Sequence, residues 1–418
     1  MRIITCFYFS AMMLLIIAPN SKAEILNITA SFTPSLWMPD NNKFTNTTPQ
    51  SGYCVRYPDE CKNGDVSLGT GLVLKPSRSL TVNDNPRDSL YFKLPSSFRE
   101  VEVSNGTSKT IVSFRINALS ARYTAAKNHG VYDWKNVQFF SEPTGGCVYR
   151  APGWIGGYYA WWLWSYPEGV GGCYNITSTD RPEGDDKYIN GVDGISLGYD
   201  LKTPNPLSME SGIYTGTLRF DVGPGMDIDF GDNFQASDST LTINFSLSVN
   251  HELKINTNIE ERKISLQPCD KGKKCTEEQG KANWERWMIN RITPELTGKS
   301  IFSISSSGSF TTYLQCEYQI GDNCSIKGDD SKENIPVQTL LTLPNNIVDK
   351  NSGGVVSRKR IGIGKDINRN IFETKEFGQD KSGYIDFLII KQDVDRMLST
   401  RPDTYRGAVT VIFDSHIY

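Results

Sequence analysis

The chain is poor in metal-binding side chains and carries little net charge. Its 418 residues include only three histidines, and no two cysteines have the CxxC spacing of common zinc sites. We therefore expect no metal site and no cofactor. The formal net charge is −3, which provides no broad electrostatic attraction for nucleic acid or for an anionic membrane.

Long apolar runs are missing after the first residues. Residues 3–18 form an apolar run behind a positively charged start, and residues 21–23 (Ser-Lys-Ala) fit the small-x-small pattern that signal peptidase cleaves. No later segment reaches the roughly 20 apolar residues that span a bilayer. We predict a signal peptide over residues 1–23 and a secreted mature chain that begins near Glu24. An uncleaved N-terminal anchor is the alternative.

Enzyme signatures are weak. Residues 194–198 (Gly-Ile-Ser-Leu-Gly) match the GxSxG pattern of a nucleophilic serine, but that pattern requires a helix after the serine and none is indicated. Acidic residues at 227, 229 and 232 lack the spacing of an EF-hand calcium loop, so a polar turn is favoured. We predict that the protein is not an enzyme; a secreted hydrolase with Ser196 as its nucleophile is the alternative.

The mature chain has an even number of cysteines. Cys6 lies in the signal peptide, and the other eight of the nine cysteines fall as four close pairs along the chain. Disulfides persist in oxidising compartments, and neighbour-to-neighbour pairing is the simplest connectivity. We predict the disulfides Cys54–Cys61, Cys147–Cys173, Cys269–Cys275 and Cys316–Cys324.

Alternation of apolar and polar residues is abundant. In residues 240–249 (TLTINFSLSV) every second side chain is apolar, which is typical of a strand with one buried face. One segment, residues 277–292, has the pattern of a helix. Many strands with few helices predict an all-β chain of two sandwich domains. Further strands are expected at 110–117, 216–222, 300–306, 311–318, 337–343, 384–390 and 407–414.

A weak similarity between two segments of the chain indicates where the two domains divide. Residues 211–221 and 403–414 both read as a turn, a tyrosine and glycine, and then an apolar run that ends in aspartate. A connector rich in Gly, Asp and Ser lies between them, at residues 224–239. We predict an N-terminal β domain over 24–236 and a C-terminal domain over 237–418.

The most aromatic segment lies between Cys147 and Cys173. It holds four of the eight tryptophans, interleaved with tyrosines and flanked by glycine pairs. Aromatic faces pack against the apolar C–H surface of sugars, and polar neighbours orient the hydroxyls. We predict a rigid binding surface for a receptor, with a sugar favoured; the alternative is that the tryptophans are core. The predicted ligand-binding residues are Arg150, Trp154, Tyr158, Tyr159, Trp161, Trp162, Trp164 and Tyr166.

Four segments in the second half of the chain carry a family resemblance. They are residues 212–233 (GIYTGTLRFDVGPGMDIDFGDN), 240–255 (TLTINFSLSVNHELKI), 314–324 (LQCEYQIGDNC) and 404–418 (TYRGAVTVIFDSHIY). With a signal peptide and an N-terminal β domain before them, they resemble the two-domain tip adhesins and related minor subunits of bacterial chaperone–usher fimbriae.

The resemblance implies an immunoglobulin-like C-terminal domain that lacks its last strand. A periplasmic chaperone would fill the resulting groove first, and an adjacent fimbrial subunit would replace it at an outer-membrane usher. The partners would be these three proteins and a host glycan or glycoconjugate. The protein would pass through the periplasm to a fimbrium on the bacterial cell surface. The assembly strand would contain Ala408, Val409, Val411 and Phe413.

The position of the subunit in the fibre depends on the mature N-terminus. Residues 24–32 (EILNITASF) alternate and could be a donor strand for a neighbour or the first strand of the N-terminal domain. A tip adhesin requires the second role, and we expect a fimbrial tip adhesin. The alternative is a structural minor subunit without receptor binding.

Overall fold

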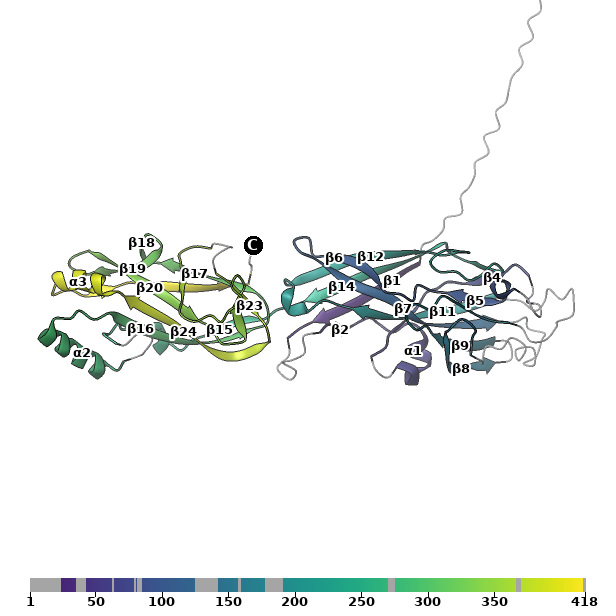
Figure 1. Cartoon of the computed structure of the whole chain (residues 1–418), viewed down its shortest axis with the longest axis horizontal. Coiled ribbons are helices and arrows are strands. Elements are labelled where there is room, and N and C mark those ends of the chain that lie inside the picture. The colour runs from purple at the N-terminus through teal and green to yellow at the C-terminus, as the bar shows by residue number, and fades with distance from the viewer. Residues whose placement is uncertain are drawn as a thin grey trace, which may run out of the picture.

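The computed structural model describes residues 24–34, 43–61, 64–78, 80, 85–124, 142–156, 159–176, 191–269, 275–365 and 370–415, without the side chains of 24 and 151–156. The predicted signal peptide lies outside these residues. Two β-rich bodies lie end to end along the long axis of the molecule (Figure 1). Within the described ranges no helix has the length and apolarity needed to cross a membrane.

The N-terminal body is one strongly curled sheet with a small second sheet. The main path runs in the order β13-β4-β11-β7-β6-β12-β14-β1-β2, with β3 beside β11, β9 beside β7 and β8 beside β9; β10 and β5 form the small sheet. The strands are β1 Glu24–Phe32, β2 Thr45–Asn46, β3 Ser67–Gly69, β4 Leu74–Pro76, β5 Leu90–Lys93, β6 Arg99–Ser104, β7 Lys109–Thr124, β8 Val148–Gly156, β9 Tyr159–Ser165, β10 Gly172–Asn175, β11 Gly191–Lys202, β12 Gly212–Asp221, β13 Phe234–Ala236 and β14 Thr240–Val249. Short helical turns are α1 Tyr53–Arg56, η1 Pro58–Cys61, η2 Pro86–Asp88 and η5 Pro206–Ser208.

The curled sheet encloses a single apolar core. Phe114 of β7 packs its ring 5.6 Å from Phe245 of β14 and 6.2 Å from Phe220 of β12, measured between ring centroids. The hydroxyl of Tyr199 on β11 donates to Thr48 Oγ1 at 2.8 Å, just beyond β2. Strands from opposite parts of the sheet order therefore face each other, so the sheet forms both layers of a sandwich-like half-barrel.

The C-terminal body is a sandwich of two sheets. The larger sheet has the order β15-β16-β24-β20-β19-β18, with β22 beside β20 and β25 beside β19; the smaller has the order β21-β23-β17-β26. The elements are β15 Leu253–Asn256, η6 Glu260–Arg262, α2 Glu277–Asn290, β16 Leu296–Ser306, β17 Phe310–Cys316, β18 Tyr318–Ile320, β19 Asn323–Gly328, β20 Asn334–Thr342, β21 Ile347–Asp349, β22 Lys359–Ile361, β23 Ile371–Thr374, β24 Gly378–Ile389, α3 Lys391–Ser399, β25 Tyr405–Arg406 and β26 Val409–Asp414.

Helix α2 is the helix that the sequence predicts. It begins with a capping box, in which the Thr276 side chain accepts from the Gln279 amide and the Gln279 side chain accepts from the Thr276 amide. It ends at Arg291, whose φ of 56° is left-handed. The second helix of this domain, α3, is not predicted from the sequence. Both helices lie at the end of the C-terminal domain that is far from the N-terminal domain (Figure 1).

The predicted domain boundary at residues 236/237 is wrong. Strand β14 pairs along its whole length with β12 and, in parallel, with β1, so it belongs to the centre of the N-terminal sheet. The next strand, β15, pairs with β16 of the C-terminal sheet. The chain therefore passes from one domain to the other between Val249 and Leu253. The Gly- and Asp-rich stretch before β14 is a set of turns within the first domain.

The half-buried histidine His251 occupies this crossing. Its Nε2 lies 2.8 Å from the carbonyl oxygen of Met209 in the N-terminal domain, and its Nδ1 lies 3.2 Å from Ser307 Oγ in the C-terminal domain. The ring also packs against Phe32 at 5.8 Å between centroids. One side chain thus contacts both domains, and its contacts fix the path of the chain between them.

The all-β fold and the four disulfides agree with the sequence prediction. The structure contains the bonds Cys54–Cys61, Cys147–Cys173, Cys269–Cys275 and Cys316–Cys324. Three of them join cysteines that are six to eight residues apart in the sequence, and Cys147–Cys173 joins cysteines that are 26 residues apart. Such short closures hold the shape of local segments and do not join the two domains.

Candidate functional site

The aromatic segment packs into the core on one face of β9. Trp162 and Trp164 are fully buried, and their ring centroids lie 4.6 Å apart. Phe92 of β5 packs 4.9 Å from Trp162 and 5.8 Å from Trp164. Because β9 is paired with β7 on one side and β8 on the other, neither tryptophan can turn outward without a loss of sheet pairing. These two residues therefore form the centre of the core and offer no surface to a receptor.

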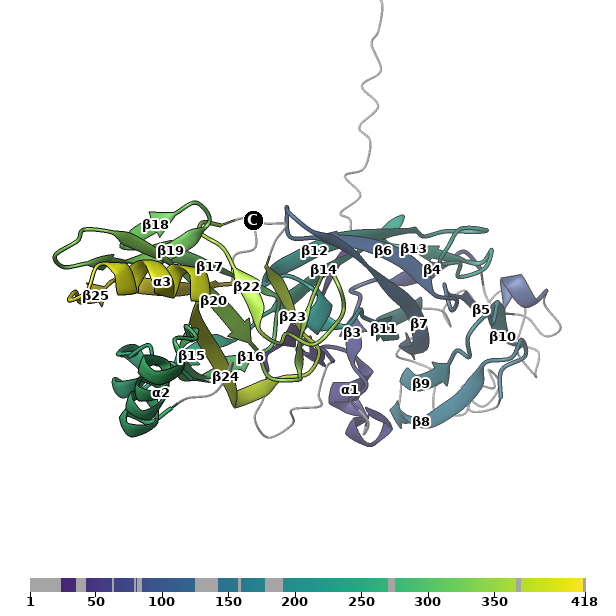
Figure 2. The same cartoon turned by 60° about the vertical axis from the view of Figure 1, so that its left-hand side comes forward.

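The opposite face of β9 is covered by α1 and the loop that the Cys54–Cys61 disulfide closes. Leu163 packs with Tyr53, Cys54 and Ala118, and α1 lies beside β8 and β9 (Figures 1 and 2). The Arg56 guanidinium carbon lies 3.1 Å from the ring centroid of Trp161, which is a cation–π contact. Trp161 is consequently only 7% exposed. A strand that is covered on both faces accommodates consecutive large side chains.

The other predicted ligand-binding residues divide into three groups. Tyr166 is buried, and its hydroxyl donates to the carbonyl of Phe92 at 3.1 Å; burial raises its pKa well above the ordinary tyrosine value. Tyr159 is half-buried, and Arg150 is exposed and pairs with Glu60 at 3.5 Å. Tyr158 and the side chain of Trp154 lie outside the described residues.

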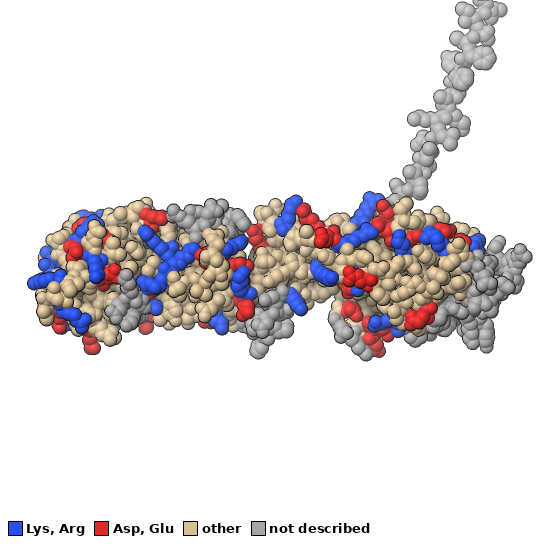
Figure 3. Space-filling view, in the orientation of Figure 1, with Lys and Arg blue, Asp and Glu red and all other residues tan. Residues whose placement is uncertain are grey.

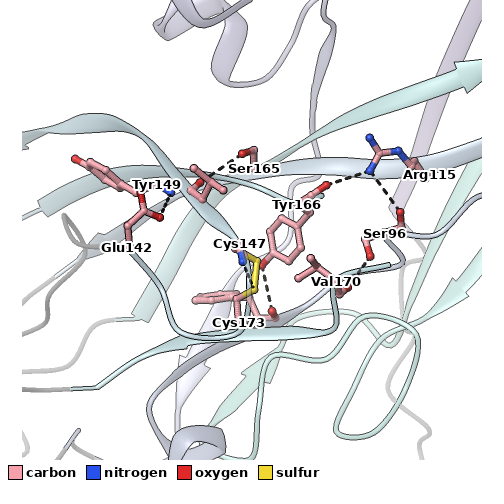
Figure 4. The surroundings of a disulfide bond; sticks show 11 residues. Ser96, Arg115, Glu142, Cys147, Tyr149, Ser165, Tyr166, Val170 and Cys173 are labelled. Atoms are coloured by element: carbon pink, nitrogen blue, oxygen red, sulfur yellow. Dashed lines mark hydrogen bonds between the residues drawn. A yellow bond between two sulfur atoms is a disulfide. The ribbon is translucent and has the colours of Figure 1, made fainter. Parts of the chain in front are cut away.

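The prediction of a flat aromatic surface is therefore wrong for Trp161, Trp162, Trp164 and Tyr166. The disulfide Cys147–Cys173 holds the base of this segment to the core rather than presenting a loop. Backbone amides next to the disulfide donate hydrogen bonds to nearby side chains (Figure 4). The Cys147 amide donates to Cys173 Sγ at 3.2 Å, and the Tyr149 amide donates to a Glu142 carboxylate oxygen at 2.9 Å. The pattern that we interpreted as a ligand platform belongs to strand β9, whose described side chains are mostly buried.

The predicted assembly strand, by contrast, lies at an open sheet edge. Strand β26 pairs with β17 over six residues, from Val409 opposite Cys316 to Asp414 opposite Thr311. It is the last strand of the order β21-β23-β17-β26, so its other side pairs with no described strand. Ala408 precedes the strand and is exposed. An unpaired edge presents a row of free backbone donors and acceptors that another strand can bind.

The inward-facing residues of β26 are apolar and only half-buried. Val409, Val411 and Phe413 pack against the C-terminal core without being enclosed by it. The Phe413 ring lies 5.3 Å from Phe302 of β16 and 6.0 Å from Phe310 of β17. The predicted strand at 407–414 is thus an edge strand whose core side remains partly open.

A second edge contributes to the same core, and the sequence prediction misses it. Strand β15 is the outer strand of the larger sheet, and its residues Leu253 and Ile255 are half-buried against the core that contains Phe302. Its alternation with the exposed Lys254 and Asn256 is the signal that could have found it. Because β16, the neighbour of β15, contacts β26 through Phe302, the two edges border one apolar side of the sandwich.

The motifs associated with enzymes and metals have structural roles. Ser196 lies within the long strand β11 and is buried, with no strand-to-helix turn around it. Asp229 is buried and, together with Asp232, holds the guanidinium of Arg87. In the described part of the chain no group of three or more His, Cys, Asp or Glu could hold a metal. Basic and acidic side chains are both scattered over the two domains on the face shown in Figure 3.

Solved structures that are similar to this chain include the following three. One is a chaperone–tip adhesin complex of CFA/I fimbriae, at 9% identity and a TM-score of 0.25, covering 94% of this chain and 97% of that chain. The second is the CsuC–CsuE chaperone–tip adhesion subunit complex of the archaic chaperone–usher Csu pili of Acinetobacter baumannii. Its identity is 10% and its TM-score 0.21, and the match covers 94% of this chain and 99% of that chain. The third is a mutant of the enterotoxigenic E. coli CFA/I adhesin CfaE. Its identity is 10% and its TM-score 0.23, and the match covers 94% of this chain and 92% of that chain. No family profile and no curated protein matches the sequence.

Proposed function

We propose that this chain is a subunit of a chaperone–usher fimbrium and that it joins the fibre by donor-strand complementation. The observation that carries the proposal is the open edge of β26, where Val409, Val411 and Phe413 are half-buried beside an unpaired backbone. A strand added at this edge gains backbone hydrogen bonds along its length and buries its alternate side chains against these residues. The edge is thus an acceptor site for an extended segment of another protein.

The chemistry of the edge fits the partners that the sequence resemblance implies. An exposed apolar edge favours aggregation unless another chain covers it. A periplasmic chaperone would cover it after export, and a neighbouring subunit would take its place at the outer-membrane usher. The protein would then reach the bacterial cell surface as part of a fimbrium.

The N-terminal segment supports a position at the fibre tip. Strand β1 pairs in parallel with β14 over nine residues, from Glu24 opposite Leu241 to Phe32 opposite Val249. Its residues Leu26, Ile28 and Ala30 are buried in the domain's own core. A structural minor subunit would need this segment free as a donor strand. We therefore propose a tip adhesin, whose N-terminal domain binds a host receptor, with a glycan as the favoured ligand.

Immunogold electron microscopy of fimbriae from the producing bacterium tests the proposal. A tip adhesin gives one gold particle at the free end of each fibre, and antibodies against the N-terminal domain should block adhesion to host cells. Label distributed along the shaft would favour the structural minor subunit. Absence of the chain from purified fimbriae would contradict the proposal as a whole.

A further inference from the structure

A small polar pocket lies on the N-terminal domain, next to the segment that covers β9. Its volume is about 260 Å³, and it is bordered by Tyr53 of α1, Asp65, Arg115 and Asn117 of β7, Arg150 of β8 and Asp200 of β11. Pockets for drug-sized ligands are roughly 300–1,000 Å³. The pocket therefore has room for a ligand of about one sugar ring, and strands rather than mobile loops supply most of its polar groups.

The polar floor of the pocket is held by a fixed network. The Asn117 amide nitrogen donates to Asp200 Oδ1 at 2.8 Å, and the Arg115 guanidinium pairs with the other oxygen of Asp200. Arg115 also donates to the carbonyl of Tyr166 at 3.1 Å. These contacts fix the planes of the amide and the guanidinium before any ligand arrives, which lowers the entropic cost of binding.

Two buried polar atoms in this pocket have no hydrogen-bond partner among the described residues. Asn117 Oδ1 and Arg115 Nε are buried and have no hydrogen bond. Tyr53 is 5% exposed, and its hydroxyl makes no hydrogen bond to any described residue. A buried polar group without a partner costs stability. Two such groups in one small pocket, beside the Tyr53 hydroxyl, indicate a site that a polar ligand completes.

The Tyr53 hydroxyl and the Asn117 amide oxygen lie close together against Gly198 of β11. A Cβ on Gly198 would overlap both Tyr53 Oη and Asn117 Oδ1, so both oxygens lie over the bare backbone of this glycine. Burial, with a smaller effect from the Asp65 carboxylate, raises the pKa of Tyr53 well above the ordinary tyrosine value. The phenol therefore keeps its proton and can donate, while Asn117 Oδ1 can only accept.

We propose that this pocket binds one neutral pyranose unit of a receptor glycan, a proposal that rests on the receptor-binding role proposed above. A sugar hydroxyl both donates and accepts, so a single hydroxyl can accept from Tyr53 Oη and donate to Asn117 Oδ1. The carboxylates of Glu60, Asp65 and Asp200 outnumber the guanidiniums of Arg115 and Arg150 around the pocket. This balance disfavours an anionic sugar such as sialic acid.

The test is glycan binding by the full mature chain and two matched variants. The probe is an array of oligosaccharides that end in neutral hexose, in N-acetylhexosamine or in sialic acid. Tyr53→Phe removes only the unpartnered hydroxyl, and Tyr174→Phe removes a hydroxyl from β10, outside the pocket. We expect binding to glycans with a neutral terminus, a loss of about tenfold in affinity for Tyr53→Phe, and no change for Tyr174→Phe.

Gly198→Ala provides a second variant, since its methyl group would displace Tyr53 Oη and Asn117 Oδ1 from their positions and should also abolish binding. Thermal unfolding identifies any variant that has lost its fold. Equal glycan binding by the wild type and by Tyr53→Phe would contradict the proposal that this pocket binds the sugar. The proposed adhesin function would still stand, because a glycan would then be bound elsewhere on the chain. Binding only to sialylated glycans, or to none, would also contradict the pocket proposal. Fibre incorporation of the wild-type chain, measured in parallel, tests the proposed function separately.

Discussion

The ring of Phe413 on edge strand β26 lies 5.3 Å from the ring of Phe302 on β16 in the opposite sheet. This contact joins the two layers of the C-terminal sandwich at the side where no described strand pairs with β26. Phe413 is nevertheless only half-buried. The core of this domain is therefore closed by contacts from one side and remains open to a further strand from the other.

The apolar side of this edge should decide assembly. Val411→Asp puts a charge where a donor strand would bury its side chains, and the cost of burying an unpaired carboxylate opposes strand addition. We expect the amount of this variant in sheared fimbriae to fall at least about tenfold. Thr410→Asp is the control, because Thr410 is on the exposed face of the same strand. Equal incorporation of the two variants would contradict the assembly role of this edge.

The tryptophans of β9 should matter for stability. Trp162→Ala removes a fully buried side chain that packs on Phe92 and Trp164. We expect the free energy of unfolding of the N-terminal domain to fall by about 3–5 kcal/mol, measured by urea denaturation. Tyr159→Ala, on the same strand but half-buried, should cost clearly less. If Trp162→Ala unfolds like the wild type and only receptor binding is lost, our assignment of this residue to the core is incorrect.

An ion pair between a buried carboxylate and a half-buried arginine stabilises the turn before β13. The Asp229 side chain is 1% exposed and lies 2.8 Å from Arg87 Nη1. The hydrogen bonds to Asp232 and Asp229 raise the pKa of Arg87 above its ordinary value. Arg87→Ala leaves the Asp229 carboxylate buried without its cation, and we expect a loss of about 3 kcal/mol in unfolding free energy. The exposed pair Arg219–Asp221, at 3.8 Å, provides the control: Arg219→Ala should change stability by less than about 0.5 kcal/mol.

The domain junction should weaken in acid. Burial lowers the pKa of His251 below its ordinary value of 6.5, an effect that the hydrogen bond to Met209 partly opposes. The unfolded chain then binds a proton more readily than the folded chain. The contribution of His251 to stability is complete above about pH 6.5 and is lost as the pH falls through the lowered folded-state pKa.

His251→Gln tests this pH dependence because glutamine does not titrate. We expect the melting temperature of the wild type to fall between pH 7 and pH 5 by more than that of the variant. The difference between the two curves isolates His251 from the carboxylates, which titrate in both proteins. Parallel curves would show that His251 does not sense pH in this range.

The sequence predicts the strands and the local disulfides because both depend on short-range patterns. The alternation of Leu241, Ile243 and Phe245 has the period of a half-buried strand, and these residues face the core as predicted. The pairing of Cys316 with Cys324 needs only a tight turn between them. Strand β26 could likewise be predicted from its run of apolar residues.

What the sequence cannot provide is the identity of the surface that covers each strand. Trp161 is buried because Arg56, more than a hundred residues earlier, lies over its ring, and no local pattern records that contact. The domain boundary lies outside what local pattern can predict for the same reason, since β14 joins the first sheet through pairing with β1 at the start of the chain. The candidate sugar pocket also combines residues from α1, β7 and β11, which are distant in the sequence.

Amide hydrogen exchange on β26 is the most direct test of the open edge. Measured by NMR on the isolated chain, the amides of Val409–Asp414 that point away from β17 should exchange rapidly, while those that donate to β17 should be protected. In the assembled fibre, the outward-pointing amides should become protected as well. Equal protection of both sets in the isolated chain, or continued rapid exchange in the fibre, would contradict donor-strand complementation at this edge.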